Sequence, residues 1–505
     1  MFCSISGCTL SGASGALVRV ETTLSNGLPN FYVVGLPDSI VRESKERIRS
    51  ALQDSGFSFP SGRITVNLAP AHLKKIGSAL DFPIAASILC AEGLLPQGED
   101  SLLSRAMLLG ELSLNGELRP VPGALAMAAH AKDLGCRRLL LPAENAKEAA
   151  LLDGPEIIGI RTLGEAVDYL RGFRALSPTP HHFPVLSAAD PKPLQALMGQ
   201  PLTLRALTVS AAGMHPILLW GPPGTGKTMA AQALRTLLPP PSPREYLETG
   251  SVYSSLGLSL PKERPYRAPH HTVSAAGLAG GGQPIKPGEI TLAHHGILFL
   301  DELPEFSRPV LETLRQPLEE HRIRIRRSHE SVTLPADFLL IASMNPCPCG
   351  YYPDRSRCQC SESQIRHYLG RLRGPLLDRI DLGVLLGAPD YEDLKPLSAN
   401  DAENLRESVR KAREIQAKRY QELPYHYNAQ ILSTDLPRFC PLSFEGEDLL
   451  KTAYRHYRLS VRGMHRILKI ARTLADLSES SSIGIPHLQE AIQLRCPDFL
   501  GMTSC

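Results

Sequence analysis

The chain has 505 residues, of which 43% are hydrophobic and 21% are charged. These values exclude a small disulfide-stapled protein, a wholly disordered chain and a coiled-coil rod, and the length predicts two to four domains with their own cores. The formal net charge is only +3, so a nucleic-acid partner has to be argued from local patches. The sequence has no signal-peptide pattern and no run of 18 apolar residues, which predicts a cytoplasmic protein with no membrane partner.

The pattern of the chain predicts three folded parts and one linker. Residues 1–175 alternate strand-like and helical segments, as an α/β or α+β domain does. Residues 176–193 contain five prolines and little apolar periodicity, which predicts an extended connector. From 194 to 396 strands and helices alternate around glycine-rich turns, and from 397 to 505 the pattern is helical.

A phosphate-binding loop is predicted where a short apolar run, residues 217–220, meets a helical pattern. The loop consists of Gly221, Pro222, Pro223, Gly224, Thr225, Gly226, Lys227 and Thr228. Its glycines let successive backbone N–H groups surround phosphate at a positive helix terminus. In this pattern Lys227 contacts the β and γ phosphates and the Thr228 hydroxyl holds magnesium. The alternative is a chance glycine-rich turn.

Two carboxylates follow the apolar run 297–300. We expect Asp301 to bind magnesium and Glu302 to polarise the attacking water, because nucleotide hydrolysis needs both groups beside the phosphate-binding loop. The alternative is an acidic cap on a core strand.

Two further polar residues suit a hydrolysis site. Asn345 ends a third apolar strand, where it could contact the γ phosphate or the attacking water. Arg379 lies among apolar residues, and a ring-shaped hydrolase would use such a group in trans. The alternatives are an Asn-Pro turn at Asn345 and an intrachain ion pair of Arg379 with Asp378 or Asp381.

Several of these segments together resemble a known family. GPPGTGKT, ILFLDELPEF, FLLIASMNP, PLLDRIDL and the late helix SVRGMHRILKIARTLADL resemble AAA+ ATPases of the magnesium-chelatase-like group. The stretch RAPHHTVSAAGLAGGGQPIKPGEITLAHHGILFLDELPEF and the motif NPCPCGYY are more closely similar to the bacterial YifB/ComM proteins. NLAPAHLKKIGSALDFPIA and GELSLNGELRPVPGALAMAAHA resemble the N-terminal domain of that family, so the resemblance covers nearly the whole chain.

The resemblance implies an α/β protein with an AAA+ P-loop ATPase core, a C-terminal helical lid and an N-terminal Lon-protease-like α+β domain. It implies a homohexameric ring with ATP and magnesium between subunits. Members of this kind act as motors on single-stranded or branched DNA and promote branch migration when transforming DNA is integrated. By motif position, Asp301 and Glu302 match the Walker B pair, Asn345 sensor 1, Arg379 the arginine finger and Arg462 the sensor 2 arginine. Arg466 is the second choice for sensor 2.

The Lon-like domain departs from its protease relatives. Ser78 lies near the position of the Lon nucleophile, but Leu125 or Ala126 stands where that family needs its catalytic lysine. A serine without a base is only a hydroxyl. We therefore expect residues 1–175 to be non-proteolytic and to bind DNA or partners.

Four cysteines within fourteen residues have a C-x-C-x8-C-x-C spacing: Cys347, Cys349, Cys358 and Cys360. Four thiolates suit a structural, tetrahedral zinc ion. The alternatives are a redox-sensitive thiol cluster and four merely small residues.

A basic strand precedes the Asn345 strand and alternates arginine with apolar residues, which places several arginines on one face. The residues predicted to contact DNA are Arg322, Arg324, Arg326 and Arg327. By resemblance this hairpin points into the ring pore, where arginines pair with phosphates without reading sequence. The alternatives are a solvated face and ion pairs with Glu319 and Glu320.

A glycine-rich segment between Arg267 and Lys286 resembles the helix-2 insert of the same group, and we expect Lys286 to contact DNA from a second pore loop. The alternative for His270 and His271 is a histidine pair packed at a turn.

Two other functions remain open for the whole protein, a magnesium-chelatase-type motor for metal insertion and a protein-remodelling AAA+ motor. The first needs porphyrin-holding partner subunits and leaves the basic hairpin unexplained.

Overall fold

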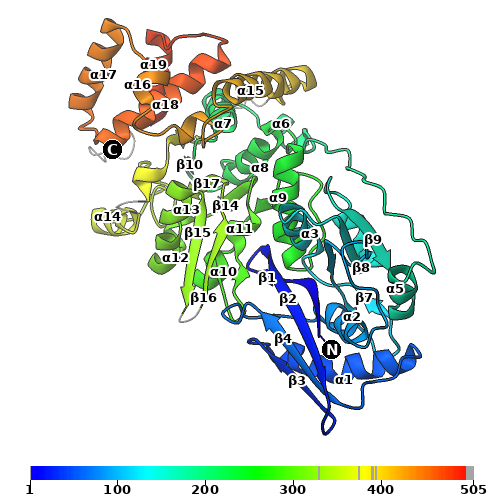
Figure 1. Cartoon of the computed structure of the whole chain (residues 1–505). Helices are drawn as coiled ribbons and strands as arrows, with labels where there is room; N and C mark the ends of the chain where they lie inside the picture. Colours follow the sequence, from blue (N-terminus) through cyan, green and yellow to red (C-terminus); the bar gives the residue numbers. More distant parts are fainter. Residues whose placement is uncertain (1, 328–329, 373–375, 388–391, 393–394, 496–505) are drawn as a thin grey trace.

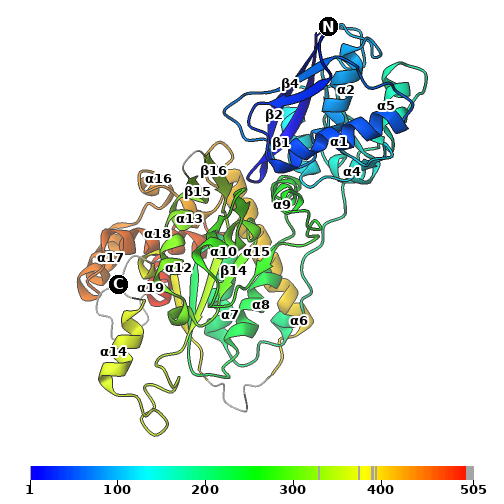
Figure 2. The same ribbon diagram turned by 90° about the horizontal axis from the view of Figure 1, so that it is seen from below.

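The computed structural model describes residues 2–327, 330–372, 376–387, 392 and 395–495. The end of the predicted lid, residues 496–505, lies outside the described residues. The N-terminal domain lies to one side, and the P-loop domain and the helical lid form the other body of the molecule (Figures 1 and 2). Residues 175–190, all of them described, carry neither helix nor strand between the two bodies.

The N-terminal domain is built on a seven-stranded mixed sheet of order β3-β4-β2-β1-β5-β8-β9. The strands are β1 (Phe2–Ser11), β2 (Ser14–Ser25), β3 (Asn30–Val34), β4 (Arg63–Ala69), β5 (Ala106–Leu108), β8 (Arg138–Pro142) and β9 (Glu156–Ile160), with a small antiparallel pair of β6 (Glu111–Leu112) and β7 (Leu118–Arg119). In β4 the side chains of Ile64, Val66 and Leu68 are buried while their neighbours are not, the period of two that a half-buried strand requires.

Five helices complete this domain: α1 (Ser39–Asp54), α2 (Asp81–Ala91), α3 (Ala124–Asp133), α4 (Ala143–Ala149) and α5 (Leu163–Leu170). The Asp38 side chain accepts a hydrogen bond from the Val41 N–H and so caps α1. Every residue of α2 is buried, as its nearly continuous apolar sequence dictates. Three elements of this domain, β1, α4 and β9, carry no clear periodic signal in the sequence and were not predicted.

The P-loop domain contains a five-stranded, all-parallel sheet of order β11-β14-β17-β10-β18. Its strands are β10 (Ile217–Trp220), β11 (Tyr266–Arg267), β14 (Ile297–Leu300), β17 (Leu339–Met344) and β18 (Leu382–Leu385). β10, β14 and β17 are entirely buried, as expected for a parallel sheet covered on both faces.

Helices flank this sheet: α6 (Lys192–Gln195), α7 (Pro201–Gly213), α8 (Lys227–Leu237), α9 (Pro243–Ser255), α10 (Ala275–Ala279), α11 (Glu289–Leu292), α12 (Arg308–Thr313), α13 (Arg315–Glu320) and α14 (Glu362–Gly370). Two antiparallel hairpins stand apart from the sheet. They are β12 (Gly280–Gly281) with β13 (Lys286–Pro287), and β15 (Arg322–Arg327) with β16 (Glu330–Pro335).

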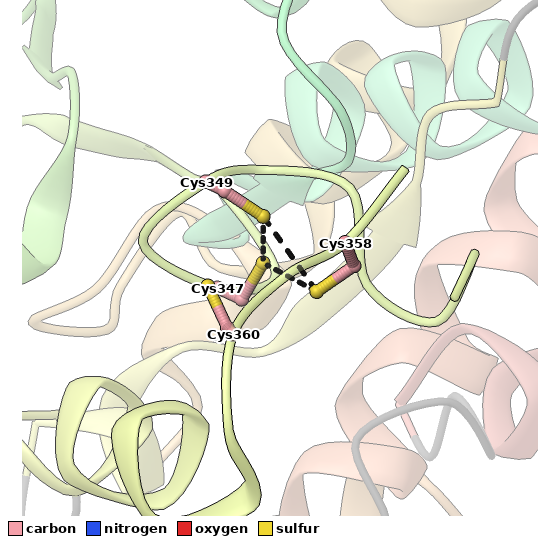
Figure 3. Close-up of side chains that lie close together, drawn as sticks. All are labelled: Cys347, Cys349, Cys358 and Cys360. Atoms are coloured by element: carbon pink, nitrogen blue, oxygen red, sulfur yellow. Dashed lines mark hydrogen bonds between the residues drawn. The ribbon is translucent and has the colours of Figure 1, made fainter. Parts of the chain in front are cut away.

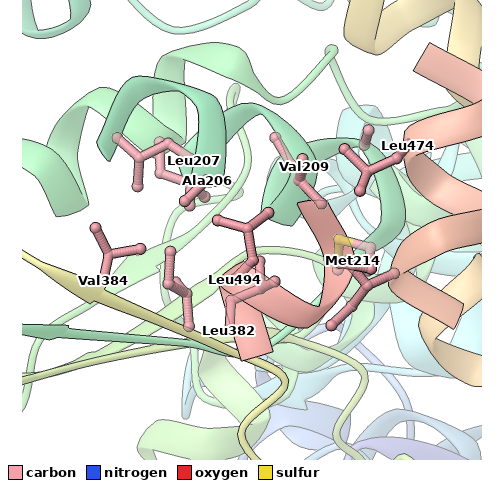
Figure 4. Close-up of a cluster of buried hydrophobic side chains, with 14 of the residues drawn as sticks. Ala206, Leu207, Val209, Met214, Leu382, Val384, Leu474 and Leu494 are labelled. Carbon is pink, nitrogen blue, oxygen red and sulfur yellow. The ribbon is translucent and has the colours of Figure 1, made fainter. Parts of the chain in front are cut away.

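The helical lid consists of α15 (Ala399–Arg419), α16 (Leu436–Phe439), α17 (Phe444–His456), α18 (Val461–Leu477) and α19 (Ile485–Arg495). It shares one hydrophobic core with the P-loop domain. Figure 4 shows Leu474 and Leu494 of the lid beside Val209 on α7 and Leu382 on β18. The lid is therefore fixed to the sheet through α7 and β18.

The N-terminal domain packs against α9 and the β15–β16 hairpin. Leu125 on α3 lies in one apolar cluster with Tyr246 on α9. The turn between β1 and β2 contributes Ala13 to a second cluster that contains Val332 and Leu334 of β16. Among the described residues, no helix is long and apolar enough to cross a membrane.

Candidate nucleotide-binding site

The predicted phosphate-binding loop lies at the carboxyl end of the central strand β10 and leads into α8. Gly224 and Gly226 have positive φ angles of 81° and 85°, which glycine adopts without strain. Gly226 occupies the N-cap of α8, where the first helical N–H groups have no partner inside the helix. The loop therefore presents backbone donors and the positive end of a helix to one concavity, as phosphate binding requires.

Lys227 is held at the centre of this loop. Its ammonium group donates to the carbonyls of Gly221 and Pro222 at 2.7 and 2.9 Å and to Asn345 Oδ1 at 3.0 Å. Burial lowers the pKa of Lys227, and the carboxylates of Asp301 and Glu302 act in the opposite direction. The structure thus brings together the ends of β10, β14 and β17, whose residues the sequence analysis selected separately.

The two carboxylates lie at the end of β14 beside Thr228. Asp301 Oδ2 lies 3.4 Å from the Thr228 hydroxyl, so two hard oxygen ligands face the loop, as a Mg²⁺ site needs. Glu302 is exposed and has a positive φ of 53°, a conformation uncommon outside glycine. Its carboxylate lies 3.8 Å from His271 Nδ1, which links it to the glycine-rich insert.

Ser343 is a site residue that the sequence analysis missed. Its hydroxyl donates to Asp301 Oδ1 and accepts the Glu302 N–H at 3.2 Å. It is fully buried on β17, next to Asp301 across the sheet, because Leu300 pairs with Ala342. The sequence feature that could have identified Ser343 is a single serine within the apolar run FLLIASM.

Arg379 lies at the opposite end of the sheet from the loop. It precedes β18, whose first residue, Leu382, pairs with Ile217 at the amino end of β10. The length of a four-residue strand, about 13 Å, therefore separates this edge from the phosphate-binding loop. The Arg379 guanidinium donates to Glu319 Oε1 at 2.6 Å. From the sequence, Asp378 or Asp381 was the alternative intrachain partner of Arg379, whereas the structure shows an ion pair with Glu319.

Arg462 and Arg466 of α18 lie beside Arg379. Arg462 is exposed and lies 4.0 Å from the same Glu319 carboxylate. Arg466 donates to the Arg379 carbonyl at 3.0 Å and forms an ion pair with Asp381. Burial lowers the pKa of Arg466 to about 9. These residues line a cavity of about 280 Å³ between the P-loop domain and the lid.

The basic hairpin has the predicted alternation. Arg322, Arg324 and Arg326 are exposed on β15 while Ile323 between them is buried. Arg322 and Arg324 lie 3.2 and 3.3 Å from Glu320, so the ion-pair alternative applies to these two. Arg327 pairs with Glu330 in the ladder, but its side chain lies outside the described part of the structure.

The glycine-rich insert adjoins this hairpin. Lys286 is exposed on β13, and its neighbour Ile285 packs with Val332 and Leu334 of β16. The rings of His270 and His271 lie 4.0 Å apart. The insert therefore packs on the apolar face of the hairpin, opposite the face that carries Arg322, Arg324 and Arg326.

The four clustered cysteines converge (Figure 3). The sulfur of Cys347 lies 3.3 Å from that of Cys349 and 3.7 Å from that of Cys358, and the last two are 3.6 Å apart. Cys360 Sγ lies within 4.8 Å of all three. The Tyr351 backbone and the neighbouring thiols lower the pKa of Cys349 to about 6, so this cluster offers a thiolate near neutral pH.

Glu248, His294 and His295 form the other described cluster with metal-ligand atoms. The Asp337 N–H donates to His294 Nδ1 at 3.1 Å, so a neutral His294 carries its proton on Nε2, which faces Glu248. A metal on that nitrogen would force a proton onto Nδ1 against the Asp337 N–H. The cluster is therefore a hydrogen-bonded network rather than a good metal site.

The Lon-like domain has no lysine at either position where the sequence analysis sought the base. Leu125 is fully buried, and α9 approaches so closely that a Cβ on Gly250 would lie 2.9 Å from Leu125 Cδ2. Ser78 donates to Glu111. The P-loop domain thus covers the position of the missing lysine.

Comparison with known proteins agrees with this architecture. The family model "Magnesium chelatase, subunit ChlI" matches residues 193–394, "Subunit ChlI of Mg-chelatase" matches 20–145, and its C-terminal model matches 399–495. The chain is 43% identical to the competence protein ComM of Haemophilus influenzae over 96% of this chain and 95% of that protein. It is 40% identical to the uncharacterized protein YifB of Escherichia coli over 97% and 96% of the two chains.

A weaker similarity, 28% identity over 38% of this chain and 39% of the other, relates it to Lon protease 2 of Bacillus subtilis. The chain therefore belongs to the YifB/ComM family of magnesium-chelatase-like AAA+ proteins, and the resemblance and fold class expected from the sequence are confirmed.

Proposed function

We propose that this protein is an ATP-hydrolysing DNA motor that acts in the cytoplasm as a homohexameric ring and promotes branch migration during homologous recombination and the integration of transforming DNA. The observation that carries the ATPase assignment is the meeting of Lys227, Thr228, Asp301, Glu302 and Asn345 at one sheet edge. The Haemophilus influenzae relative is named a competence protein, which favours transforming DNA as the context.

In the proposed site the backbone N–H groups of the loop and the Lys227 ammonium group bind the phosphates of ATP. Thr228 and Asp301 hold Mg²⁺, which supplies charge neutralisation on the phosphates when bound. Glu302 orients and polarises the attacking water, and Ser343 fixes the backbone at this corner by accepting the Glu302 N–H. Asn345 already contacts Lys227 and is placed to contact the γ phosphate.

We assign Arg379 and Arg462 to the ATP site of the neighbouring subunit. Both lie at the sheet edge opposite their own phosphate-binding loop and share Glu319. Arginines that reach the γ phosphate from a second subunit make hydrolysis depend on assembly. A homohexameric ring accommodates this arrangement, because each subunit offers a loop on one side and arginines on the other.

The hairpin arginines Arg322, Arg324, Arg326 and Arg327, together with Lys286 on the insert, are the proposed DNA contacts. Exposed guanidinium groups at a strand spacing pair with successive phosphates without reading bases.

We assign one role to each part of the chain. Residues 194–396 form the motor core and residues 397–505 its lid. Residues 1–175, joined through the linker 176–193, form a non-proteolytic domain that binds DNA or partners. We also assign a structural zinc ion to Cys347, Cys349, Cys358 and Cys360, whose four thiols suit tetrahedral coordination.

The decisive experiment measures ATP hydrolysis by the purified protein with no DNA, single strands, duplex and a four-way junction, over a salt series. Stimulation by branched or single-stranded DNA that fades with added salt is the expected result. Intact hydrolysis without stimulation by any DNA would overturn the DNA-motor proposal in favour of a protein-remodelling or chelatase-type motor.

A further inference from the structure

The cysteine cluster adjoins the phosphate-binding loop. Gly350 lies inside the cluster segment and has a positive φ of 87°. A Cβ on Gly350 would lie 2.6 Å from Pro223 Cδ and 3.8 Å from Asn345 Cγ. The cluster segment therefore rests directly on the phosphate-binding loop, at a place where only glycine fits.

The same segment continues the strand that carries Asn345. One residue separates Asn345 from Cys347, and the Gly350 N–H donates to the Cys347 carbonyl at 3.0 Å. Asn345 Oδ1 in turn accepts from Lys227 at 3.0 Å. A shift of Cys347 would therefore move Asn345 through the backbone and Gly350 through its hydrogen bond to the Cys347 carbonyl. Asn345 contacts Lys227 and Gly350 contacts Pro223, so both residues border the proposed ATP site.

The cluster segment has only a small apolar core of its own. Residues 345–361, all described, contain neither helix nor strand, and the local core consists of Cys347, Cys358 and Ile365 with partly buried neighbours. The ion pair of Arg355 with the exposed Glu362 lies at the surface, where such pairs add little stability. A segment with so small a core usually needs a metal or a covalent link.

The sulfur positions suit a single ion. Four sulfurs at about 2.3 Å from a tetrahedral zinc ion are about 3.8 Å apart, and the sulfurs of Cys347, Cys349 and Cys358 lie 3.3 to 3.7 Å from one another. A disulfide would bring two sulfurs to about 2.05 Å. The site has sulfur ligands only, which select zinc over magnesium.

We propose that the zinc ion at Cys347, Cys349, Cys358 and Cys360 clamps Gly350 against Pro223 and holds Asn345 within reach of Lys227, so that zinc occupancy sets the affinity of the ATP site. This inference rests on the proposed nucleotide site and adds its regulation. Removal of the ion, or oxidation of its thiols by a disulfide-forming oxidant, releases the segment and weakens nucleotide binding.

The test uses the full-length protein purified under reducing conditions. Zinc is counted by elemental analysis, and binding of a non-hydrolysable ATP analogue is followed by the fluorescence of Trp220, the single tryptophan, which directly precedes Gly221. We expect one zinc per chain. A Cys349→Ser, Cys358→Ser double variant should lose the zinc and bind the analogue about tenfold more weakly. Cys136→Ser, which also removes a half-buried thiol, serves as control.

A variant of Gly350 tests the contact with Pro223 independently of zinc binding. Gly350→Ala keeps all four thiols and should retain zinc, yet it should also weaken analogue binding about tenfold because its Cβ meets Pro223. Gly370→Ala, where a Cβ meets open space, should change neither quantity. This variant also keeps the test meaningful if the double cysteine variant fails to fold.

Wild-type protein without zinc would overturn the metal site, and so would a different metal or an iron–sulfur cluster. Loss of zinc with unchanged analogue affinity would overturn the clamp, as would normal binding by Gly350→Ala. Failure of the proposed ATP site would look different, because Lys227→Ala would then bind the analogue as well as the wild type. No step of the test involves DNA or hydrolysis, so its outcome is independent of the motor proposal.

Discussion

Arg379 forms a 2.6 Å ion pair with Glu319 at the sheet edge farthest from Lys227. This carboxylate holds the guanidinium in place within a single subunit. A γ phosphate from a neighbouring subunit would have to draw Arg379 away from Glu319. Under the proposed assignment of Arg379 to the neighbour's ATP site, this displacement would couple hydrolysis to ring assembly.

Complementation between two inactive variants tests the assignment of Arg379 to the neighbour's site. Arg379→Ala and Lys227→Ala should each hydrolyse ATP at least about a hundredfold more slowly than the wild type. Mixed rings contain interfaces that combine an intact Lys227 with an intact Arg379, so mixing should restore part of the activity. Inactive mixtures, with mixed assembly verified by native mass spectrometry, would refute the assignment of Arg379 to the neighbour's site.

Glu302→Gln should separate nucleotide binding from turnover. The amide keeps the size of the side chain but cannot polarise water, so hydrolysis should fall by about a hundredfold or more while analogue binding stays within about twofold of wild type. Binding by Trp220 fluorescence and phosphate release are measured on one preparation. Glu305→Gln, nearby and ion-paired with Arg371, is the control. Normal turnover by Glu302→Gln would refute the role of Glu302.

Arg324→Ala with Arg326→Ala should weaken DNA binding while sparing hydrolysis without DNA. Two lost phosphate contacts should reduce the slope of log affinity against log salt by roughly one to two. The control is Arg410→Ala on α15, a similarly exposed arginine that pairs with Glu407 and Glu414. An unchanged salt slope in the hairpin variant would show that this strand does not contact phosphates.

The folded P-loop domain should lose stability in acid through Glu245. Burial by itself raises the pKa of this carboxyl, but the buried Arg264 guanidinium outweighs that effect and holds the pKa at about 2. Arg264 donates to both Glu245 oxygens, at 3.0 and 2.9 Å. Because the pKa is about 4.5 when unfolded, up to about 3 kcal/mol of stability is present above pH 4.5 and lost as the pH falls toward 2.

Trp220 fluorescence during an acid titration measures this loss, because Trp220 is fully buried in β10. Glu490→Gln, which removes a carboxylate from a more exposed ion pair with Arg205, should leave the titration curve unchanged. Glu245→Gln should flatten it between pH 4.5 and 2 and lower stability at pH 7, since Arg264 is left without its partner. The same acid dependence in both variants would contradict the prediction.

Leu125→Lys should not create a protease. Leu125 packs against Tyr246 in a cluster closed by α9, so the new ammonium group would be buried in place of these apolar contacts, even though the Glu148 carboxylate lies 3.3 Å from the backbone nitrogen of residue 125. The expected result is a loss of about 3 kcal/mol or more in stability and no cleavage of casein. Leu134→Lys, at a position 46% exposed at the end of α3, should be tolerated. Casein cleavage by Leu125→Lys would contradict this account of the domain.

The site could be predicted best where a polar functional residue directly follows an apolar strand. The loop at Gly221–Thr228, the carboxylates after 297–300 and Asn345 could all be found from apolar runs that end in polar residues, because parallel strands bring their carboxyl ends to one edge. β1 was missed, since Phe2–Ser11 mixes serine, glycine and cysteine and gains its strand character from pairing with β2.

Pairings between distant segments could not be predicted. Glu319 and Arg379 are sixty residues apart, and only the folded sheet edge brings them together. The contact of Gly350 with Pro223 joins two loops whose separate motifs carry no signal for each other. Such relationships depend on tertiary packing, which local periodicity does not encode.

The turn between β1 and β2 of the N-terminal domain packs directly on β16 of the basic hairpin. Ala13 packs beside Val332 and Leu334, and a Cβ on Gly12 would lie 2.4 Å from Val332 Cγ1. The same domain is also fixed to α9, because the Gly123 N–H donates to the Ser254 carbonyl at 2.7 Å and the Leu125 N–H to the Ser254 hydroxyl at 3.3 Å. If the hairpin moves along DNA as proposed, the N-terminal domain would therefore have to move with it or give up the contact of Ala13 with Val332 and Leu334.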